Sequence, residues 1–321
     1  MSGGGRERIA TRRAVWRSRL LSEWWSPGVC RRSIGEVLDC GGLGPVEWLW
    51  PRQGMAYRAD PFVWPGTDLV LCEEVPLATG IGRLVALRAG DDGRFGRVGA
   101  LLDDGVHRSY PYVFRQGEAS FLLPEAAAGG SCVVYRMSEG GVPEPVATIA
   151  PGRRLVDATM FALGDRIWVA ATDLAYGSDD NLCLFHAAAP EGPWLSHAAN
   201  PVIRADRRVR SGGTPFEHRG RWYRPAQDCT ETYGGALVIN EILCLDPDRY
   251  AERAVLRLAP DPAGPFPHGL HTIAADGARC WVDGKRYVFS PIAVAGKIGR
   301  RLARLTGNGS GRAAVVPGVA A

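Results

Sequence analysis

Short hydrophobic runs alternate with turns that contain Gly, Asp or Pro along most of this chain. One arrangement occurs five times: an apolar strand, a short turn, and a second strand that ends on or beside a polar or acidic residue. The five segments cover residues 58–74, 108–125, 156–173, 213–228 and 269–284. Apolar runs of four to eight residues between turn residues are typical of β-strands. The pattern therefore predicts a series of β-hairpins.

The hairpins recur at a nearly constant spacing. Their opening positions, which we call landmarks, are separated by 50, 47, 57 and 57 residues and are Asp60, Tyr110, Asp157, Thr214 and His271. A third apolar run follows each hairpin. A period of about 40–50 residues matches a propeller blade of four antiparallel strands. An ordinary two-sheet sandwich would not need this period, so we predict an all-β fold, a five-bladed β-propeller.

The predicted propeller covers residues 33–292, and two short flexible extensions flank it. Residues 1–32 are predicted to be a basic N-terminal arm, and residues 293–321 a basic C-terminal tail that packs on the propeller, binds an acidic partner or is disordered. We expect residues 33–50 to supply an outer strand that closes the ring onto the last blade. Closure matters because an open array of blades would leave an unpaired sheet edge.

Hairpin geometry predicts where the acidic residues meet. A hairpin returns the chain to the side from which it started, so the landmarks and the ends of the second strands should share one rim of the ring. A ring of carboxylates around a channel mouth is a candidate site. The residues expected there are Asp60, Glu73 or Glu74, Glu125, Asp157, Asp173, Asp228 and Asp283, with Tyr110, Thr214 and His271 among them.

The composition narrows the classes of function. The 38 basic and 34 acidic residues give a formal charge of +4, too balanced for a nucleic-acid partner held by bulk charge. No run of about 18 apolar residues predicts a membrane span. The eight cysteines form no CxxC pair and no zinc-type Cys/His spacing, and no phosphate- or dinucleotide-binding glycine motif occurs. We therefore expect a cytoplasmic protein with reduced thiols and no cofactor. No ligand spacing identifies a metal site, although the rim carboxylates leave a divalent ion in the channel open.

Five stretches of sequence together resemble a known family. They are RADPFV, SYPYVF, VDATMF, YRPAQDCTETYGGALVINEI and GLHTI, of which the fourth is the most specific. The combination resembles the N-terminal propeller domain of glucosamine inositolphosphorylceramide transferases, which also occurs as stand-alone bacterial proteins, over about residues 33–291. More remotely, it is similar to the five-bladed fold of glycoside hydrolase families 43 and 32. In the transferases, the glycosyltransferase chemistry is generally placed in a separate C-terminal domain.

The resemblance to family 43 implies roles for two aspartates. In those enzymes an Asp that opens the first blade is the general base, and an Asp that opens a later blade tunes acidity and orients the sugar. Asp60 matches the first motif and Asp157 the second. The Glu that acts as general acid has no match, because the fourth blade opens with Gly213, Thr214 and Pro215. This departure argues against ordinary glycoside hydrolysis.

The acids have two interpretations. Glycosidic cleavage uses one protonated and one ionised carboxyl group, and crowding separates the pKa values of neighbouring carboxyls. Asp60 is then the base, and Glu74, Glu125 and Asp228 are candidate acids. Alternatively, landmark aspartates accept backbone N–H groups from neighbouring blades and hold the ring together. The candidate catalytic residues are Asp60, Asp157, Glu125 and Asp228.

Candidate substrate contacts surround these acids. Arg58 and Arg210 stand just ahead of landmarks, where a guanidinium would suit a phosphorylated, nucleotide-linked or carboxylated sugar; the same arginines can equally form structural ion pairs. Tyr110 offers a flat ring for a sugar to stack on, and His271 has a free pKa suited to a proton shuttle. Two further polar residues, Arg224 and Gln227, fall in the YRPAQD block. The predicted substrate-binding residues are Arg58, Glu74, Tyr110, Arg210, Arg224, Gln227 and His271.

The sequence thus predicts a carbohydrate-active propeller that binds an anionic sugar at its central channel and takes part in glycoside hydrolysis or glycosyl transfer. The alternative is a non-catalytic propeller that recognises a sugar or a partner enzyme and works beside a separate glycosyltransferase. A third interpretation is an assembly scaffold that uses its blade edges and tails. The expected partners are a sugar or sugar phosphate and a glycosyltransferase.

Overall fold

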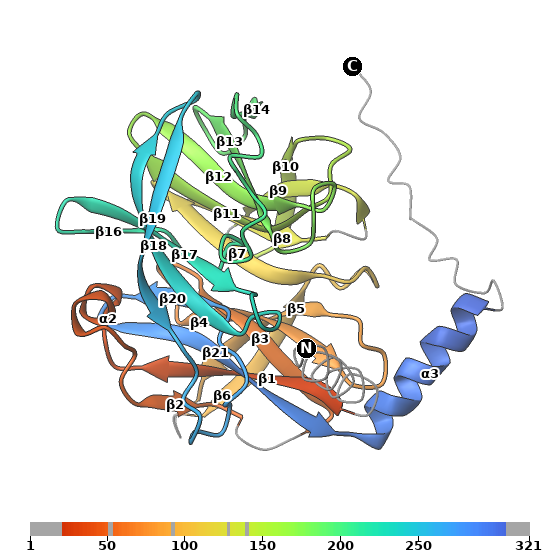
Figure 1. Ribbon diagram of the computed structural model, residues 1–321. Coiled ribbons are helices and arrows are strands. Elements are labelled where there is room, and N and C mark those ends of the chain that lie inside the picture. Colours follow the sequence, from red (N-terminus) through yellow and green to blue (C-terminus); the bar gives the residue numbers. More distant parts are fainter. Residues whose placement is uncertain (1–20, 51–53, 91–93, 127–128, 139–140, 306–321) are drawn as a thin grey trace, which may run out of the picture.

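The computed structural model describes residues 21–50, 54–90, 94–126, 129–138 and 141–305, with side chains up to residue 300. Five antiparallel sheets surround a common centre (Figure 1). The predicted five-bladed, all-β propeller is therefore confirmed.

Each of the first four blades uses consecutive strands of the chain. The first is β3 (Ala56–Val63), β4 (Leu69–Pro76), β5 (Arg83–Ala89) and β6 (Phe95–Leu101). The second is β7 (Ser109–Gln116), β8 (Ala119–Glu125), β9 (Cys132–Met137) and β10 (Pro143–Ile149). The third is β11 (Leu155–Leu163), β12 (Arg166–Asp173), β13 (Asn181–Ala187) and β14 (Leu195–Ser196), with β15 (Ile203–Arg204) also paired to β13. The fourth is β16 (Phe216–His218), β17 (Arg221–Asp228), β18 (Ala236–Leu245) and β19 (Tyr250–Leu258).

The closing blade combines strands from the two ends of the described chain. Its order is β20 (Ile273–Asp276), β21 (Arg279–Phe289), β1 (Leu21–Cys30) and β2 (Val46–Trp48). β2 lies within residues 33–50, so the predicted closing outer strand is confirmed. β1 pairs with β21 along its whole length, from Leu21 opposite Phe289 to Cys30 opposite Cys280. This pairing closes the ring.

The predicted N-terminal arm is wrong for its last residues, because Leu21–Cys30 form a strand inside the propeller. The strand buries the indole rings of Trp24 and Trp25. Proline and glycine usually interrupt strands. Because of Pro27 and Gly28, the sequence pattern does not predict this strand. Residues 1–20 of the predicted arm lie outside the described residues.

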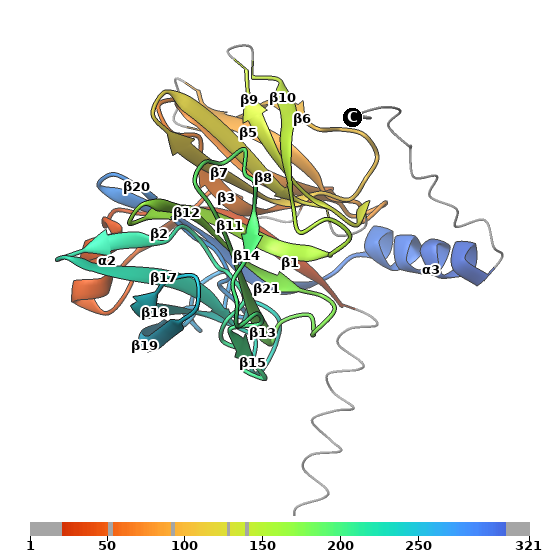
Figure 2. The same ribbon diagram turned by 90° about the horizontal axis from the view of Figure 1, so that it is seen from above.

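Two helices of the described residues lie outside the sheets. The short helix α2 (Ile34–Cys40) links β1 to β2 and begins with a capping box between Ser33 and Glu36. The helix α3 (Pro291–Leu305) covers the described part of the predicted C-terminal tail and lies beside the propeller (Figures 1 and 2). It packs on the ring there: Lys297 Nζ donates to the Leu21 carbonyl at 2.8 Å. Neither described helix has the length and apolarity needed to cross a membrane.

The largest hydrophobic core lies between blades. It joins Phe62 of the first blade, Tyr112 of the second, Met160 of the third and Trp281 of the closing blade. The rings of Phe62 and Tyr112 meet edge to face at 5.3 Å. This core therefore holds the first, second, third and closing blades together. The fourth blade packs on the closing blade in a second cluster, which contains Leu237 and Val282.

The fit between β1 and β2 can be tested at Gly28. A Cβ atom added there would lie 2.6 Å from Val46 Cγ1 and 2.7 Å from Trp48 Cε3. We expect Gly28→Val to lower the free energy of unfolding by about 1–3 kcal/mol, because overpacking forces the outer strand to move. Chemical denaturation measures the loss.

Gly96→Val is the matched control, because a Cβ at Gly96 of strand β6 meets nothing within 4 Å. If both variants were equally stable, the pairing of β1 with β2 would be contradicted.

Candidate functional site

Three landmarks share an unusual backbone conformation. Asp60, Tyr110 and Asp157 have φ angles of 52°, 45° and 50°. Each lies at a β-bulge, where the pairing of the first strand with the second shifts. Non-glycine residues in this left-handed region are strained by about 1–3 kcal/mol, and such strain persists only where the surroundings hold it.

The bulges point the landmark N–H groups at carboxylates of the preceding blade. Asp60 N–H donates to Asp283 Oδ2 at 3.0 Å, and Tyr110 N–H donates to Asp60 Oδ2 at 3.2 Å. Asp157 N–H donates to Glu125 Oε2 at 3.3 Å. The same link thus occurs at three of the five blade junctions. The interpretation in which aspartates tie neighbouring blades together is confirmed for Asp60.

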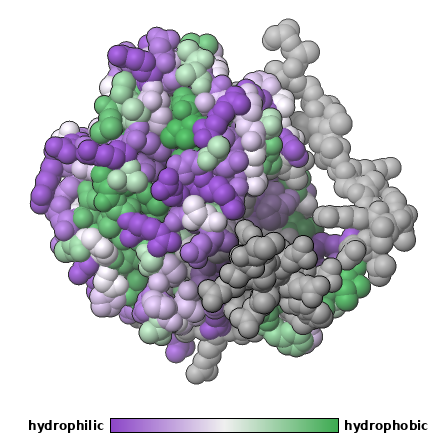
Figure 3. Space-filling view, in the orientation of Figure 1, coloured by the Kyte–Doolittle hydropathy of each residue, from purple (hydrophilic) through white to green (hydrophobic). Residues whose placement is uncertain are grey.

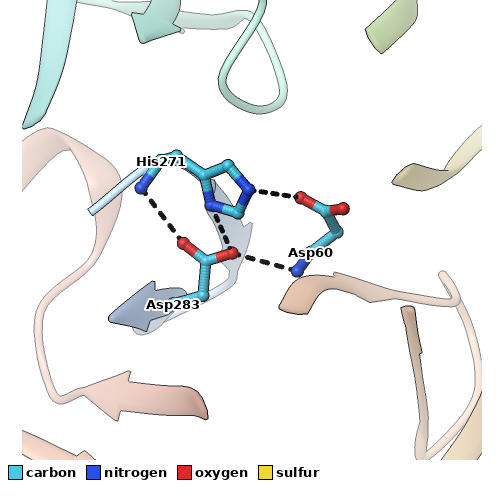
Figure 4. A group of neighbouring side chains, drawn as sticks. All are labelled: Asp60, His271 and Asp283. Atoms are coloured by element: carbon cyan, nitrogen blue, oxygen red, sulfur yellow. Dashed lines mark hydrogen bonds and ion pairs between the residues drawn. The ribbon is translucent and has the colours of Figure 1, made fainter. Parts of the chain in front are cut away.

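Asp60 forms a buried group with two residues of the closing blade (Figure 4). His271 Nδ1 lies 2.7 Å from Asp283 Oδ2, and His271 Nε2 lies 3.5 Å from Asp60 Oδ1. Thr272 Oγ1 donates to Asp60 Oδ1 at 2.8 Å. Burial raises the pKa of Asp60 to about 6, although His271 opposes the shift. Burial lowers the pKa of His271, but the two carboxylates outweigh it and raise that pKa.

Asp157 anchors the other side of the centre. Its Oδ2 accepts hydrogen bonds from Arg210 Nε at 2.5 Å and Gln227 Nε2 at 2.6 Å. Arg210 Nη2 also lies 3.5 Å from Glu125 Oε2. Burial, and then the charge of Asp157, raise the pKa of Glu125 to about 8 against the opposing effect of Arg210. The guanidinium of Arg210 lies 5.1 Å from the centre of the Tyr233 ring.

Glu73 is a further acid of this group. Burial raises its pKa well above the ordinary value, and the charges of Asp60, Glu125, Asp157 and Asp283 add to the shift. His107 Nε2 lies 3.6 Å from Glu73 Oε1. We call the assembled group the central site: Asp60, Glu73, Glu125, Asp157, Arg210, Gln227, Tyr233, His271 and Asp283.

Strand alternation explains which predicted residues reach the central site. Successive side chains of a strand point to opposite faces. Glu73 therefore faces the centre, whereas Glu74 pairs with Arg58 and Arg83. Likewise Gln227 reaches Asp157, whereas its neighbour Asp228 faces away. Of these two glutamates, Glu73 is the one whose pKa responds to the central carboxylates.

The structure places several predicted site residues elsewhere. Asp228 binds Arg257 Nε at 2.7 Å and lies outside the central site, but both residues line a cavity that Thr232 also lines. Arg224 is fully buried against Glu252 at 2.7 Å and is a structural ion pair. Arg58 pairs with Glu74 and lies over the Trp50 ring. In each case the side chain forms an ion pair with an oppositely charged residue of the same blade.

Tyr110 and Asp173 also differ from the prediction. Tyr110 is buried, with its hydroxyl 2.9 Å from Thr159 Oγ1 and accepting the Gly213 N–H at 3.0 Å. It therefore joins three blades and offers no exposed ring to a sugar. Asp173 pairs with Arg153 at 2.6 Å.

Sequence reasoning missed an aromatic and basic layer beside His271. The Trp25 ring stacks on His271 at 4.0 Å, and Lys285 Nζ lies 5.1 Å from the Trp25 ring centre. Lys285 donates to the Tyr233 carbonyl and lies 3.6 Å from Glu23 Oε1. One signal was present: Lys285 is one of only two lysines in an arginine-rich chain.

A cavity of about 1190 Å³ adjoins this layer. Thr232 lines it, and Thr232 Oγ1 lies 3.4 Å from Lys285 Nζ. The face drawn in Figure 3 carries both hydrophilic and hydrophobic residues. Glu23, Tyr287 and Lys297 of α3 are among the other lining residues. The cavity has room for a ligand larger than one sugar ring, but its lining residues belong to the layer around Lys285 and to α3 rather than to the central site.

Asp60, His271 and Asp283 also lie close enough together to surround a cation, since their ligand atoms are within 4.8 Å of one another. These atoms already serve the protein, however. Asp283 Oδ1 accepts the N–H groups of His271 and Thr272 at 3.1 and 3.0 Å. The group is therefore better described as a hydrogen-bonded link between the first and closing blades.

Comparison with known proteins identifies the family. Residues 52–262 match the family described as Glucosamine inositolphosphorylceramide transferase 1, N-terminal. The chain belongs to this family. The transferase of that name from Oryza sativa subsp. japonica is 29% identical over 224 residues, covering 67% of this chain and 29% of the relative. The one from Arabidopsis thaliana is 29% identical over 205 residues, covering 61% of this chain and 27% of the relative. The chain thus spans under a third of the length of these relatives.

Solved structures with a similar fold include two glycoside hydrolases. A family 117 glycoside hydrolase from Zobellia galactanivorans has a TM-score of 0.49 at 12% identity and covers 84% of this chain and 91% of its own. A GH43_1 enzyme from Xanthomonas citri has a TM-score of 0.49 at 13% identity and covers 78% of this chain and 92% of its own. At this level of similarity they carry no argument about function.

The raised pKa of Glu125 predicts a pH-dependent stability. A carboxyl that holds its proton more tightly in the folded state stabilises the protein at low pH and loses this effect as the pH rises towards its folded pKa. We therefore expect stability to fall between pH 5 and 8, and Glu125→Gln to reduce that slope by up to about 1 kcal/mol per pH unit. Urea denaturation at several pH values measures it.

Glu118→Gln serves as the control, because the Glu118 side chain is 97% exposed. Equal slopes for wild type and Glu125→Gln would show that Glu125 titrates normally.

Proposed function

We propose that this chain is a sugar-binding propeller that holds its ligand at the central site. The observation that carries the proposal is the convergence of acids, a guanidinium and the partly exposed ring of Tyr233 from separate blades. Carboxylates accept hydrogen bonds from sugar hydroxyls, and an aromatic ring packs against the apolar face of a sugar. Binding sites typically combine such apolar surface with a few fixed polar groups.

The polar groups of the site are held in place before any ligand arrives. Both oxygens of Asp60 accept hydrogen bonds from the protein, and Asp157 Oδ2 accepts two. Such support fixes the orientation of a binding group. Each carboxylate oxygen has two lone-pair positions, so acceptor capacity remains for a ligand, above all at Glu125 and Glu73.

The charge balance favours a neutral or amino sugar over the anionic sugar suggested by the sequence. Asp60, Asp157 and Asp283 surround Arg210 and His271, whereas burial raises the pKa values of Glu73 and Glu125 and favours their neutral forms. Arg210 already pairs with Asp157. No guanidinium of the described central site is left to receive a phosphate. The name of the relatives includes glucosamine, whose ammonium group would suit an excess of carboxylates.

The matched part makes up less than a third of each relative, so most of each relative's chain lies outside the propeller. We therefore also propose that the propeller presents its sugar to a separate glycosyltransferase. Recognition and chemistry would then be divided between two units, as the family resemblance implies.

Tyr233 tests the binding proposal. Its side chain is 36% exposed and lies against Arg210 and His271. We expect Tyr233→Ala to weaken binding of glucosamine or a glucosamine-containing oligosaccharide about tenfold, because a stacked ring contributes roughly 1 kcal/mol or more. Calorimetry measures the affinity, with glucose 6-phosphate as the anionic probe.

Tyr176→Ala is the matched control. Tyr176 is 38% exposed and also lies beside arginines, but it is outside the central site. Tighter binding of the phosphate than of the amino sugar would overturn the charge argument, and an equal loss in both variants would overturn the site.

A second candidate function, acid–base catalysis on a glycosidic bond, is favoured by one observation. The pKa values of two central carboxyls are raised unequally, to about 6 for Asp60 and about 8 for Glu125. At neutral pH this leaves Glu125 protonated as an acid and Asp60 largely ionised as a base, the pairing that glycosidic cleavage requires.

Turnover of aryl glycosides tests this candidate. If the site is catalytic, Glu125→Gln should lower kcat at least a hundredfold for a sugar substrate, because the proton donor is lost. Unaltered turnover in this variant would exclude Glu125 as the acid. Binding without turnover in the wild-type chain would leave recognition as the function.

A further inference from the structure

Two cysteines face each other across the seam that closes the propeller. Cys30 is the last residue of β1, and Cys280 is the second residue of β21. The pairing of these strands places the two residues directly opposite each other. Both side chains are buried in the same apolar cluster, between the fourth and closing blades. Each of the two paired strands therefore carries a thiol at the same position of the pairing.

The backbone geometry suits a covalent link. Opposed residues of antiparallel strands have Cα atoms about 4.5–5.5 Å apart. Disulfides span Cα separations of about 4.4–6.8 Å, so the strands need not move far to be joined. Cys30 and Cys280 are both free thiols.

The two thiols also differ in acidity. A hydrogen bond with Cys280 is the main cause that lowers the pKa of Cys30 to about 6. The same hydrogen bond, with burial, raises the pKa of Cys280. Thiolates are the nucleophiles of thiol–disulfide exchange. Cys30 is therefore the thiol that reacts first, and Cys280 is the thiol that resolves the product.

The remaining cysteines lack this arrangement. In the described strands, Cys72 lies opposite Val85, Cys132 opposite Ile149, Cys183 opposite Ala171 and Cys244 opposite Ala251. Cys229 follows β17, and its thiol donates to Gln227 Oε1. Cys40 is exposed on α2, and no described strand brings it a cysteine partner. The seam pair is thus distinguished by position as well as by chemistry.

We propose that Cys30 and Cys280 form a redox site, at which a low-molecular-weight disulfide oxidant cross-links β1 to β21. The Cys30 thiolate attacks one sulfur of the oxidant, forms a mixed disulfide and expels one oxidant thiolate. Cys280 then loses its proton and attacks the Cys30 sulfur, which releases the second oxidant thiol. The protein loses two hydrogens in total, and the oxidant disulfide is reduced to two thiols.

The location gives the oxidant a route in and the bond a consequence. Cys30 ends its strand and precedes Arg31, whose side chain is 84% exposed, and residues 277–279 before Cys280 are exposed as well. Local opening at this strand end would admit a small disulfide. The bond would enclose residues 30–280, which contain the first four blades, and would turn a seam held by hydrogen bonds into a covalent ring.

Oxidation of the full chain with oxidised glutathione tests the proposal. The number of thiols in the denatured protein should fall from eight to six. A non-reduced tryptic digest should contain CWVDGK, residues 280–285, linked to LLSEWWSPGVCR, residues 20–31. The Tm of the oxidised chain should exceed that of the reduced chain by roughly 5–10 °C, because a long closed loop constrains the unfolded state.

Two variants sharpen the test. Cys280→Ser should abolish the linked peptide and the gain in Tm, and Cys30→Ala serves the same purpose should the first variant fail to fold. Cys40→Ser, which alters an exposed thiol, should retain both. Absence of the linked peptide in the wild-type chain, or a cross-link through other cysteines, would overturn the proposal.

Discussion

Pairing of β1 with β21 is the interaction on which the rest of this structure depends. A propeller exists only as a closed ring, because each blade buries one face against the next and an open end would expose both a core face and a sheet edge. The chain closes its ring with strands that are more than 240 residues apart in sequence. Closure places Asp283 and His271 of the last blade against Asp60 of the first. Without that seam the central site would lose one of its sides.

The carboxylates at the centre have structural and chemical roles at once. Asp60, Glu125 and Asp283 each accept a landmark N–H from the next blade, so each helps to hold a strained backbone conformation. The same burial that makes these hydrogen bonds strong also raises the pKa values of Asp60 and Glu125. The two interpretations of the acids are therefore compatible. Asp60 and Glu125 hold neighbouring blades together, and their pKa values of about 6 and about 8 also lie near neutral pH.

The central site is asymmetric in a way that bears on its ligand. On one side, Asp60, His271 and Asp283 satisfy one another and sit beneath Trp25. On the other side, Glu125 and Arg210 lie next to the partly exposed Tyr233. The first side is a packed support, and the second is the part that a ligand can reach. The cavity near Thr232 and Lys297 is lined by residues other than Glu125, Arg210 and Tyr233.

The sequence by itself determined the number of blades, their hairpins and the family, because strand length, turn residues and repeat spacing are local properties that survive without tertiary contacts. It also identified Asp60, Asp157, Glu125, Arg210, Gln227 and His271 as residues that the ring would bring together. Only the tertiary structure decided that Glu73 replaces Glu74, that Asp228 and Arg224 turn away into ion pairs, and that Tyr110 is buried. It also decided that residues 21–30 form the closing strand. The reason is physical: which face of a strand meets the centre, and which distant strand completes a sheet, depends on pairing partners that no local pattern specifies.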